Sequence, residues 1–203
     1  MIIGFVRHGR TDWNAEGKIQ GQTDIPLNEE GIRQAHALAE RLKGEERIWD
    51  AVASSDLSRA YRTAGIIAEG LGIPLLDGDA RLRERYFGDA EGTKENERHE
   101  RWGADWRSAA PGVESSAEMK ARGLDALAEW VNGYPERNLL VVTHGSFLVG
   151  LLAELCPGLT DEHLHNLSYS VLERHGQEWR ARVYNCVKHL DGLAGRREGS
   201  LLL

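Results

Sequence analysis

Short apolar runs alternate with longer stretches of helical period along most of the chain. Runs of strand-forming residues lie at Ile2–Arg7, Ala51–Ser54 and Leu139–Thr143, and a weaker run lies near Leu75. Stretches whose apolar residues recur every three or four positions separate them. This order is typical of a parallel sheet with helices on both faces. The pattern therefore predicts an α/β fold with three layers.

Three of the helical stretches carry signals at their ends. The first follows Asn28 as N-cap, has two acids in its first turn and ends at a glycine. The second has Asp56 as its predicted N-cap, which places Arg59 in the first helical turn. The third begins with Ser115 and Glu118 at capping-box spacing. Each has one apolar stripe: Ile32, Ala35, Ala39 and Leu42; then Leu57, Ala60, Ala64, Ile67 and Leu71; then Leu124, Leu127 and Val131.

The C-terminal part of the chain has a different pattern. In YSVLERHGQEWRARVYN, apolar and polar residues alternate around His175-Gly176-Gln177, which predicts a β-hairpin and an antiparallel edge strand. Residues 191–203 show no sustained period, and we expect a loose C-terminal tail. A single domain over residues 1–190 accounts for the rest, because a chain of 203 residues suits one sizeable core.

Composition and charge narrow the classes of function. The formal net charge of −7 argues against a nucleic-acid binder and against a polybasic membrane surface, since both need a broad cationic face. Cys156 and Cys186 stand alone, so we expect reduced thiols in a cytoplasmic protein and no cysteine-bound metal. The start MIIGFV has no basic segment before it and runs into RHGR, which fits neither a signal peptide nor a membrane span. The sequence leaves monomer and homodimer open.

The candidate chemistry lies where strands end. The pairs His8-Gly9 and His144-Gly145 each follow a predicted strand, and open parallel sheets bind ligands at the carboxyl ends of their strands. A glycine has no Cβ, so its backbone N–H could approach an anion closely. Arg7 and Arg59 belong to the same edge. These cations would repel one another without an anion between them, so we expect a phosphate site.

A structural role is the alternative for each histidine. A single histidine at a strand end is more often a hydrogen-bonded structural residue, and His8 alone would be interpreted in that way. Two histidines at equivalent strand ends favour the anion site. The remaining histidines keep the structural interpretation: His36, His99, His163, His165, His175 and His189.

Several ordered blocks of sequence carry a further signal. They are RHGRTDWN, GQTDIPLNEEGIRQA, SSDLSRAYRTA, LRERYFGDAEG, PGVESSAEM and VVTHGSFL. Together they resemble the histidine phosphatase superfamily, in its phosphoglycerate mutase-like branch, over residues 1 to about 190. The resemblance implies a phosphoglycerate mutase-like sandwich and a phosphatase without metal or other cofactor. Its partner would be a small phosphorylated substrate, of the broad-specificity or α-ribazole phosphatase type.

The resemblance also implies a role for each matched residue. His8 would attack phosphorus and become a phosphohistidine, from which water releases phosphate. Arg7, Arg59 and His144 would bind the phosphoryl oxygens, and Glu84 would donate a proton to the leaving alkoxide. The substrate-binding positions that match are Asn14, Gln20, Gly21 and Gly145.

The residue types suit these roles. Arginine presents a planar fork of donors to phosphate oxygens and stays charged. The adjacent cations should depress the pKa of His8 and keep its imidazole neutral for attack. Glu84 must be protonated to act as an acid. Without the resemblance, Glu84 would be interpreted as an ion-pair partner of Arg81, Arg83 or Arg85.

Four further positions either depart from the pattern of the family or have a simpler explanation. Relatives commonly have an acid after RHG, where this chain has Arg10, and we expect Arg10 to face solvent. Ordinary turn chemistry is the alternative for Asn14, Gln20 and Gly21.

Residues 86–115 correspond to the insertion that covers the pocket in relatives and sets the substrate. Trp102 and Trp106 lie four residues apart within it, which favours helix packing; an apolar wall for the leaving group is the alternative. The insertion is short and mixes acids with bases, so a phosphatase is favoured over a phosphoglycerate mutase. A non-catalytic phospho-ligand module and a metallohydrolase using His8 and His144 are further alternatives, although the second lacks additional ligands at the strand ends.

Overall fold

The predicted sheet is present in the computed structural model, which describes residues 1–46, 49–134, 136–159 and 163–193. Its strands lie in the order β3-β2-β4-β1-β5-β6. Neighbours among the first four are parallel, whereas β5 is antiparallel to β1 and β6 is antiparallel to β5. The bounds are β1 (Ile2–Arg7), β2 (Ala51–Ser54), β3 (Leu75–Gly78), β4 (Leu139–Thr143), β5 (Tyr169–His175) and β6 (Glu178–Cys186). The mostly parallel sheet with an antiparallel hairpin at one edge is confirmed.

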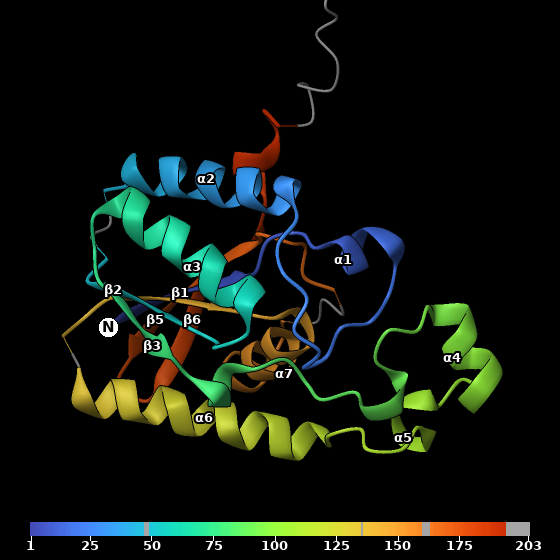
Figure 1. Ribbon diagram of the computed structural model, residues 1–203. Helices are drawn as coiled ribbons and strands as arrows, with labels where there is room; N and C mark the ends of the chain where they lie inside the picture. The colour runs from blue at the N-terminus through green and yellow to red at the C-terminus, as the bar shows by residue number, and fades with distance from the viewer. Residues whose placement is uncertain (47–48, 135, 160–162, 194–203) are drawn as a thin grey trace, which may run out of the picture.

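Helices cover both faces of this sheet (Figure 1). On one face lie α2 (Glu29–Lys43) and α3 (Ser58–Leu71), and on the other lie α6 (Ser116–Gly133) and α7 (Gly145–Leu155). Alternate strand residues face the two helical layers, because successive side chains of a strand point to opposite faces. Phe5 and Val141 pack with α6 and α7, while Val6 and Val142 pack with α2 and α3. The three-layer sandwich is therefore confirmed.

The predicted helix starts are confirmed in two cases and corrected in one. The Asn28 side chain accepts from Gly31 N at 2.9 Å, and Ser115 forms the capping box with Glu118. Asp56 does not cap α3. Leu57 occupies the N-cap position without a side-chain bond, and Asp24, from a loop far away in sequence, accepts the Ser58 N–H at 2.8 Å.

The carboxylate of Asp56 is used elsewhere. It forms an ion pair with Arg83, whose Nε lies 2.7 Å from Oδ1. Two parallel bonds between opposite charges, from Arg83 Nε and Nη2 to the two carboxylate oxygens, favour this orientation of Asp56 over a single bond to a backbone N–H, and Asp24 provides the cap. The sequence favoured Asp56 as the cap because it lies next to the helix in the chain, whereas Asp24 does not.

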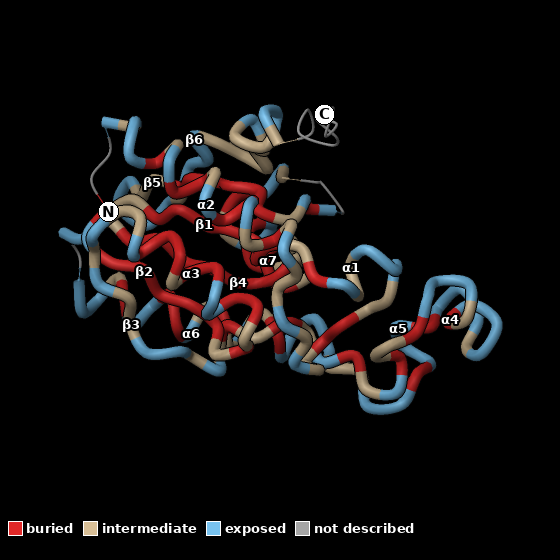
Figure 2. Tube along the Cα trace, turned by 45° about the horizontal axis from the view of Figure 1, so that its top comes forward, coloured by how far each residue is buried: buried red, intermediate tan, exposed pale blue. Residues whose placement is uncertain are grey.

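The insertion of residues 86–115 projects from the body of the molecule beside α1 (Figures 1 and 2). It contains η2 (Gly88–Ala90), α4 (Glu95–Trp102) and α5 (Trp106–Ala109). Gly103, with φ of +76°, ends α4, so Trp102 and Trp106 lie on different helices and the expected single-helix pair is wrong. Trp106 nevertheless packs in a small core with Phe87, as the favoured packing interpretation requires.

The remaining short elements are α1 (Asp12–Glu16), η1 (Ala80–Leu82) and η3 (Lys188–Leu190). Most of the predicted tail, residues 194–203, lies outside the described residues. Among the helices that the structure describes, none combines the length and the apolar character needed to cross a membrane.

Candidate active site

The register of β1 and β4 brings the two histidines together. These parallel neighbours pair Arg7 with Thr143, so the next residues, His8 and His144, leave the sheet side by side. The His8 N–H donates to the Thr143 carbonyl at 2.8 Å and fixes the start of the loop. The centroids of the two imidazoles are 5.1 Å apart, and both side chains are buried. The carboxyl edge of the sheet therefore holds both residues, as expected.

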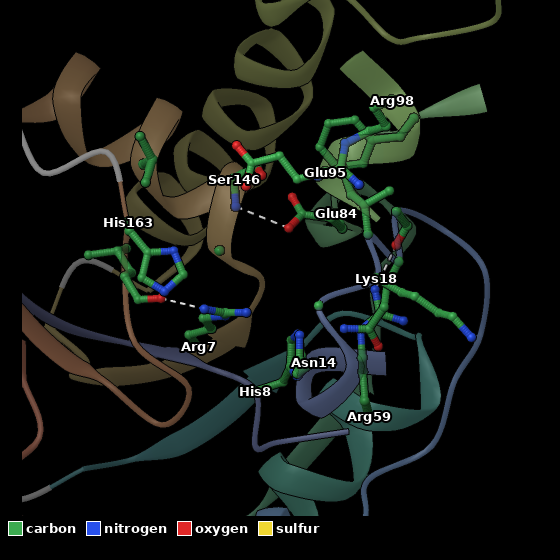
Figure 3. Close-up of a pocket in the computed structure, with 18 residues that line it drawn as sticks. Arg7, His8, Asn14, Lys18, Arg59, Glu84, Glu95, Arg98, Ser146 and His163 are labelled. Atoms are coloured by element: carbon green, nitrogen blue, oxygen red, sulfur yellow. Dashed lines mark hydrogen bonds between the residues drawn. The ribbon is translucent and has the colours of Figure 1, made fainter. Parts of the chain in front are cut away.

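A cavity of about 340 Å³ lies at this edge (Figure 3). His8 lines it, and His144 lies fully buried beside His8. The other residues predicted to be catalytic or substrate-binding also line the cavity: Arg7, Asn14, Gln20, Gly21, Arg59, Glu84 and Gly145. They come from β1, α1, the loop after α1, α3, the segment after η1 and the start of α7.

The protonation of His8 suits a nucleophile. Its Nδ1 lies 2.7 Å from the Gly9 carbonyl oxygen, which can only accept, so Nδ1 carries the hydrogen and Nε2 keeps its lone pair. Burial, together with the adjacent guanidiniums of Arg59 and Arg7, holds the pKa of His8 well below its usual range. The imidazole is therefore neutral near pH 7.

A hydroxyl determines how His144 can act. Its Nε2 lies 2.9 Å from Ser55 Oγ, and that oxygen accepts the Leu57 N–H at 3.3 Å. The Ser55 hydroxyl is then able to donate to Nε2, which leaves the ring hydrogen of His144 on Nδ1. This Nδ1 is buried and has no partner. Burial, followed by the charge of Arg59, lowers the pKa of His144 well below its usual range.

The two arginines each keep an unused donor. Arg7 Nη1 donates to the Leu164 carbonyl, and Arg59 donates to the carbonyls of Thr23 at 2.9 Å and Gly21 at 2.6 Å. The Nε of both arginines is buried without a partner. Burial lowers the pKa of Arg59 to about 10, so its guanidinium stays charged near neutral pH. With His144 Nδ1, three buried donors close to His8 are left without a partner among the described residues, which favours an anion at this position.

Glu84 is held at the start of α7. Its Oε2 accepts from Ser146 N at 3.0 Å, and its Oε1 accepts from Phe147 N and Arg85 N at 2.8 Å each. The carboxylate therefore occupies the N-terminus of a helix, where the backbone favours negative charge. The side chain is buried and lines the cavity beside Ser146 (Figure 3).

The alternative of an ion pair for Glu84 is wrong. The three neighbouring arginines have other acceptors: Arg81 bonds Asp79, Arg83 bonds Asp56, and Arg85 Nε donates to the Glu114 carbonyl. The backbone amides of α7 satisfy the carboxylate instead.

Arg122, which the sequence analysis did not single out, fixes the segment that carries Glu84. From α6 its Nη1 donates to the carbonyls of Arg81 at 2.8 Å and Arg83 at 2.6 Å, and its Nη2 donates to the Glu84 carbonyl at 3.1 Å. Its ion pair with Glu114 is 2.8 Å long. No local motif marks such a residue, because its partners lie far away in the chain.

The loop after α1 is fixed by polar contacts rather than by turn residues alone. Gln20 Oε1 accepts from Thr11 Oγ1 at 2.9 Å, and the Asn14 side chain accepts from the same hydroxyl at 3.1 Å. Glu91 accepts from the backbone of Gln22, and a Cβ on Gly21 would lie 1.9 Å from the Glu91 carboxylate. Gly21 is thus required by this close approach.

The two glycines after the histidines have different surroundings. The Gly9 N–H donates to Thr63 Oγ1 at 3.1 Å, and a Cβ there would meet the Gly31 carbonyl oxygen at 2.7 Å. Gly9 therefore serves packing against α2, and its predicted approach to an anion is wrong. Gly145 lines the cavity, and a Cβ there would lie 3.2 Å from Arg7 Nε, so this glycine leaves space for the guanidinium.

The structure also bears on Arg10 and on the alternative of a metal site. Arg10 forms a half-exposed ion pair with Glu30 at 2.8 Å and does not line the cavity. Within the described ranges, no group of three or more His, Cys, Asp or Glu side chains is arranged to hold a metal ion. A metal site on His8 and His144 would therefore lack a third side-chain ligand of these types in this part of the chain.

Comparisons with known proteins identify the family. The histidine phosphatase superfamily (branch 1) matches residues 3–187. The uncharacterized phosphatase PhoE of Bacillus subtilis is 40% identical, over 94% of this chain and 97% of that protein. A metal-independent phosphoserine phosphatase of Arabidopsis thaliana is 35% identical, over 97% of this chain and 86% of that protein. The structure of a mycobacterial glucosyl-3-phosphoglycerate phosphatase has a TM-score of 0.81 at 33% identity, over 91% and 98% of the two chains.

The match spans the whole sheet and both helical layers. It includes the strand ends that carry His8 and His144 and the helix that carries Arg59. Sequence and fold agree. The three relatives named above are phosphatases, and other relatives that match are named phosphoglycerate mutases. The chain therefore belongs to the histidine phosphatase superfamily, as an enzyme that hydrolyses phosphate esters.

Proposed function

We propose that this enzyme is a metal-independent phosphatase that hydrolyses small phosphomonoesters through a phosphohistidine on His8, with Glu84 as the proton donor. One observation carries the proposal: beside a neutral His8, Arg7, Arg59 and His144 each keep a buried N–H that has no partner in the described part of the chain. Phosphoryl oxygens are acceptors that suit these donors, and they would satisfy all three.

The first step transfers the phosphoryl group to His8. Because Gly9 holds the Nδ1 hydrogen, the Nε2 lone pair forms the new N–P bond while the P–O bond to the alcohol breaks. Arg7 and Arg59 would stabilise the charge on the equatorial oxygens as the bond changes. His144 would donate from Nδ1 to one of those oxygens, since Ser55 occupies its Nε2.

Glu84 would serve both steps of the reaction. In its protonated form it gives a proton to the departing alkoxide, which a poor leaving group needs. The resulting carboxylate then accepts a proton from water as the water oxygen attacks phosphorus and the N–P bond breaks. Inorganic phosphate and neutral His8 are the products. Contacts to the amides of Ser146 and Phe147 keep the carboxyl group in place.

Phosphate release from a panel of phosphomonoesters, measured with EDTA present, tests the proposal. The wild type should release phosphate without added metal, and His8→Ala should not, while its thermal unfolding stays cooperative. His36→Ala, on the exposed side of α2, is the matched histidine control and should keep full activity. Turnover by His8→Ala, or loss of turnover with EDTA, would overturn the proposal.

The same assay separates the alternatives. It includes conversion of 3-phosphoglycerate to 2-phosphoglycerate with and without 2,3-bisphosphoglycerate. Isomerisation without net phosphate release would make the enzyme a mutase. Binding of phosphate without either activity would support a phospho-ligand module.

A further inference from the structure

Arg98 is a buried cation that the proposed reaction does not use. It lies on α4, lines the cavity and is 8% exposed. Figure 3 shows it on the other side of Glu84 from His8. Its Nη1 donates to the Thr93 carbonyl at 2.6 Å, and its Nε is buried without a partner. Within the residues that the structure describes, no carboxylate forms an ion pair with this guanidinium.

These features repeat those of the arginines at the proposed phosphate position. Arg7 and Arg59 are also buried, also donate to backbone carbonyls and also keep a buried Nε without a partner. Burial lowers the pKa of Arg98, and the charges of Glu95 and Glu97 on the same helix offset this only in part, without an ion pair among the described residues. A buried guanidinium of this kind is costly unless an anion reaches it. Arg98 therefore has the environment of an anion-binding arginine, but beyond Glu84, where the alcohol part of a substrate would lie.

The neighbouring charged side chains do not supply that anion. Glu95 lines the cavity too, but its side chain is 80% exposed. The Lys18 ammonium is paired with Glu16 at 2.6 Å and points away from His8 in Figure 3. Apolar residues make up much of the remaining wall: Ile19, Phe87 and Val149.

We propose that Arg98 binds a carboxylate on the alcohol part of the substrate, so that the preferred esters are small phosphomonoesters of hydroxy acids. The inference rests on the proposed phosphatase function. The Arg98 guanidinium lies 4.8 Å from the centroid of the Trp106 ring, which holds its donor fork in place. Arg107 stacks on the same ring at 4.5 Å but does not line the cavity, so Arg98 alone of the two presents its fork there. One such fork matches a carboxylate, whereas a second phosphate dianion would need more charge.

Pairs of esters that differ in the carboxylate test this inference. 3-Phosphoglycerate is compared with glycerol 3-phosphate, and O-phosphoserine with O-phosphoethanolamine. The wild type should prefer the carboxylate member of each pair by roughly 10- to 100-fold in kcat/KM, the size expected for a charge-assisted bond at a buried site. Arg98→Gln should reduce the preference to within about threefold while the carboxylate-free esters change little.

The control is Arg101→Gln, which removes the same charge from an exposed position on α4 that does not line the cavity. It should keep the wild-type preference. Equal use of both members by the wild type would overturn the inference. So would an equal loss on all esters with Arg98→Gln, because that result indicates a structural role on Trp106. A preference for 2,3-bisphosphoglycerate that depends on Arg98 would replace the carboxylate by a second phosphate.

A binding measurement separates this inference from the proposed function. His8→Ala blocks attack, so the Kd of 3-phosphoglycerate and of glycerol 3-phosphate can be measured without turnover. Tighter binding of the carboxylate ester, lost in His8→Ala/Arg98→Gln, supports the role of Arg98 even if the wild type hydrolyses no ester. Equal Kd values in His8→Ala, with hydrolysis intact in the wild type, would defeat the inference and leave the phosphatase standing.

Discussion

Lowering the pH from 7.5 to 5.5 should destabilise the fold through its two buried active-site histidines. Burial and the surrounding cations hold the pKa of His8 and of His144 well below the usual range. In the unfolded chain both pKa values return to about 6.5. At pH values between the lowered pKa of the folded state and the pKa of about 6.5 in the unfolded state, the unfolded chain binds protons that the folded chain does not. The free energy of unfolding therefore falls as the pH falls.

The magnitude follows from this difference in proton binding. At pH 5.5, a histidine with a pKa of about 6.5 lowers the free energy of the unfolded chain by about 1.4 kcal/mol, against about 0.1 kcal/mol at pH 7.5. His8 and His144 together should remove about 3 kcal/mol of stability. Burial also lowers the pKa of His163, and that of His189 to about 4, so the total loss is larger. A variant is needed to isolate one residue.

Urea unfolding of the wild type and of His144→Gln, in phosphate-free buffer at both pH values, supplies that comparison. The variant lacks one buried histidine, so the stability gap between the two proteins should shrink by about 1.4 kcal/mol on acidification. His36→Gln, at an exposed position of α2, should follow the wild type. A gap of the same size at both pH values would refute the reasoning about His144.

Three further predictions concern the reacting groups. Glu84→Gln should slow hydrolysis of alkyl phosphates by about 100-fold or more but that of p-nitrophenyl phosphate by less than about tenfold, since p-nitrophenolate leaves without a proton; equal losses in kcat would remove Glu84 as the acid. Arg122→Lys should slow hydrolysis of alkyl phosphates about tenfold more than that of p-nitrophenyl phosphate, because lysine cannot make all of the hydrogen bonds by which Arg122 holds the segment carrying Glu84. An unchanged ratio of kcat values between the two ester types would show that Arg122 only stabilises the fold. Gly145→Ala should raise KM severalfold by displacing Arg7, whereas Gly133→Ala, where a Cβ meets nothing within 4 Å, should leave KM unchanged; similar KM values for both variants would contradict the packing argument.

Local signals predicted most of the fold. The apolar runs at β1, β2 and β4 and the caps at Asn28 and Ser115 depend on residues close together in the chain, and they appear as expected. The prediction of Asp56 as an N-cap is wrong because Arg83 binds its carboxylate and Asp24, which is distant in sequence, caps the helix instead. The break at Gly103 was missed because i, i+4 spacing does not show whether the helix continues between the two positions.

The residues of the candidate site also fall into two groups, those that the sequence could identify and those that it could not. Residues within recognisable blocks, such as His8, Arg59 and Glu84, could be named from the sequence and line one cavity in the structure. Arg122 and Glu91 could not, because each acts through backbone groups distant in sequence. Only the structure shows that Arg98 lines the cavity and has no ion pair with a carboxylate among the described residues.

The central claim is the covalent intermediate on His8, and trapping it is the most direct test. The enzyme is mixed with a 32P-labelled phosphomonoester, quenched within milliseconds in alkali and digested to peptides. The account predicts label that is stable to alkali and labile to acid, on the peptide containing His8, absent in His8→Ala and retained in His36→Ala. Phosphate release in the burst phase without any labelled peptide, or label on a residue other than His8, would contradict it.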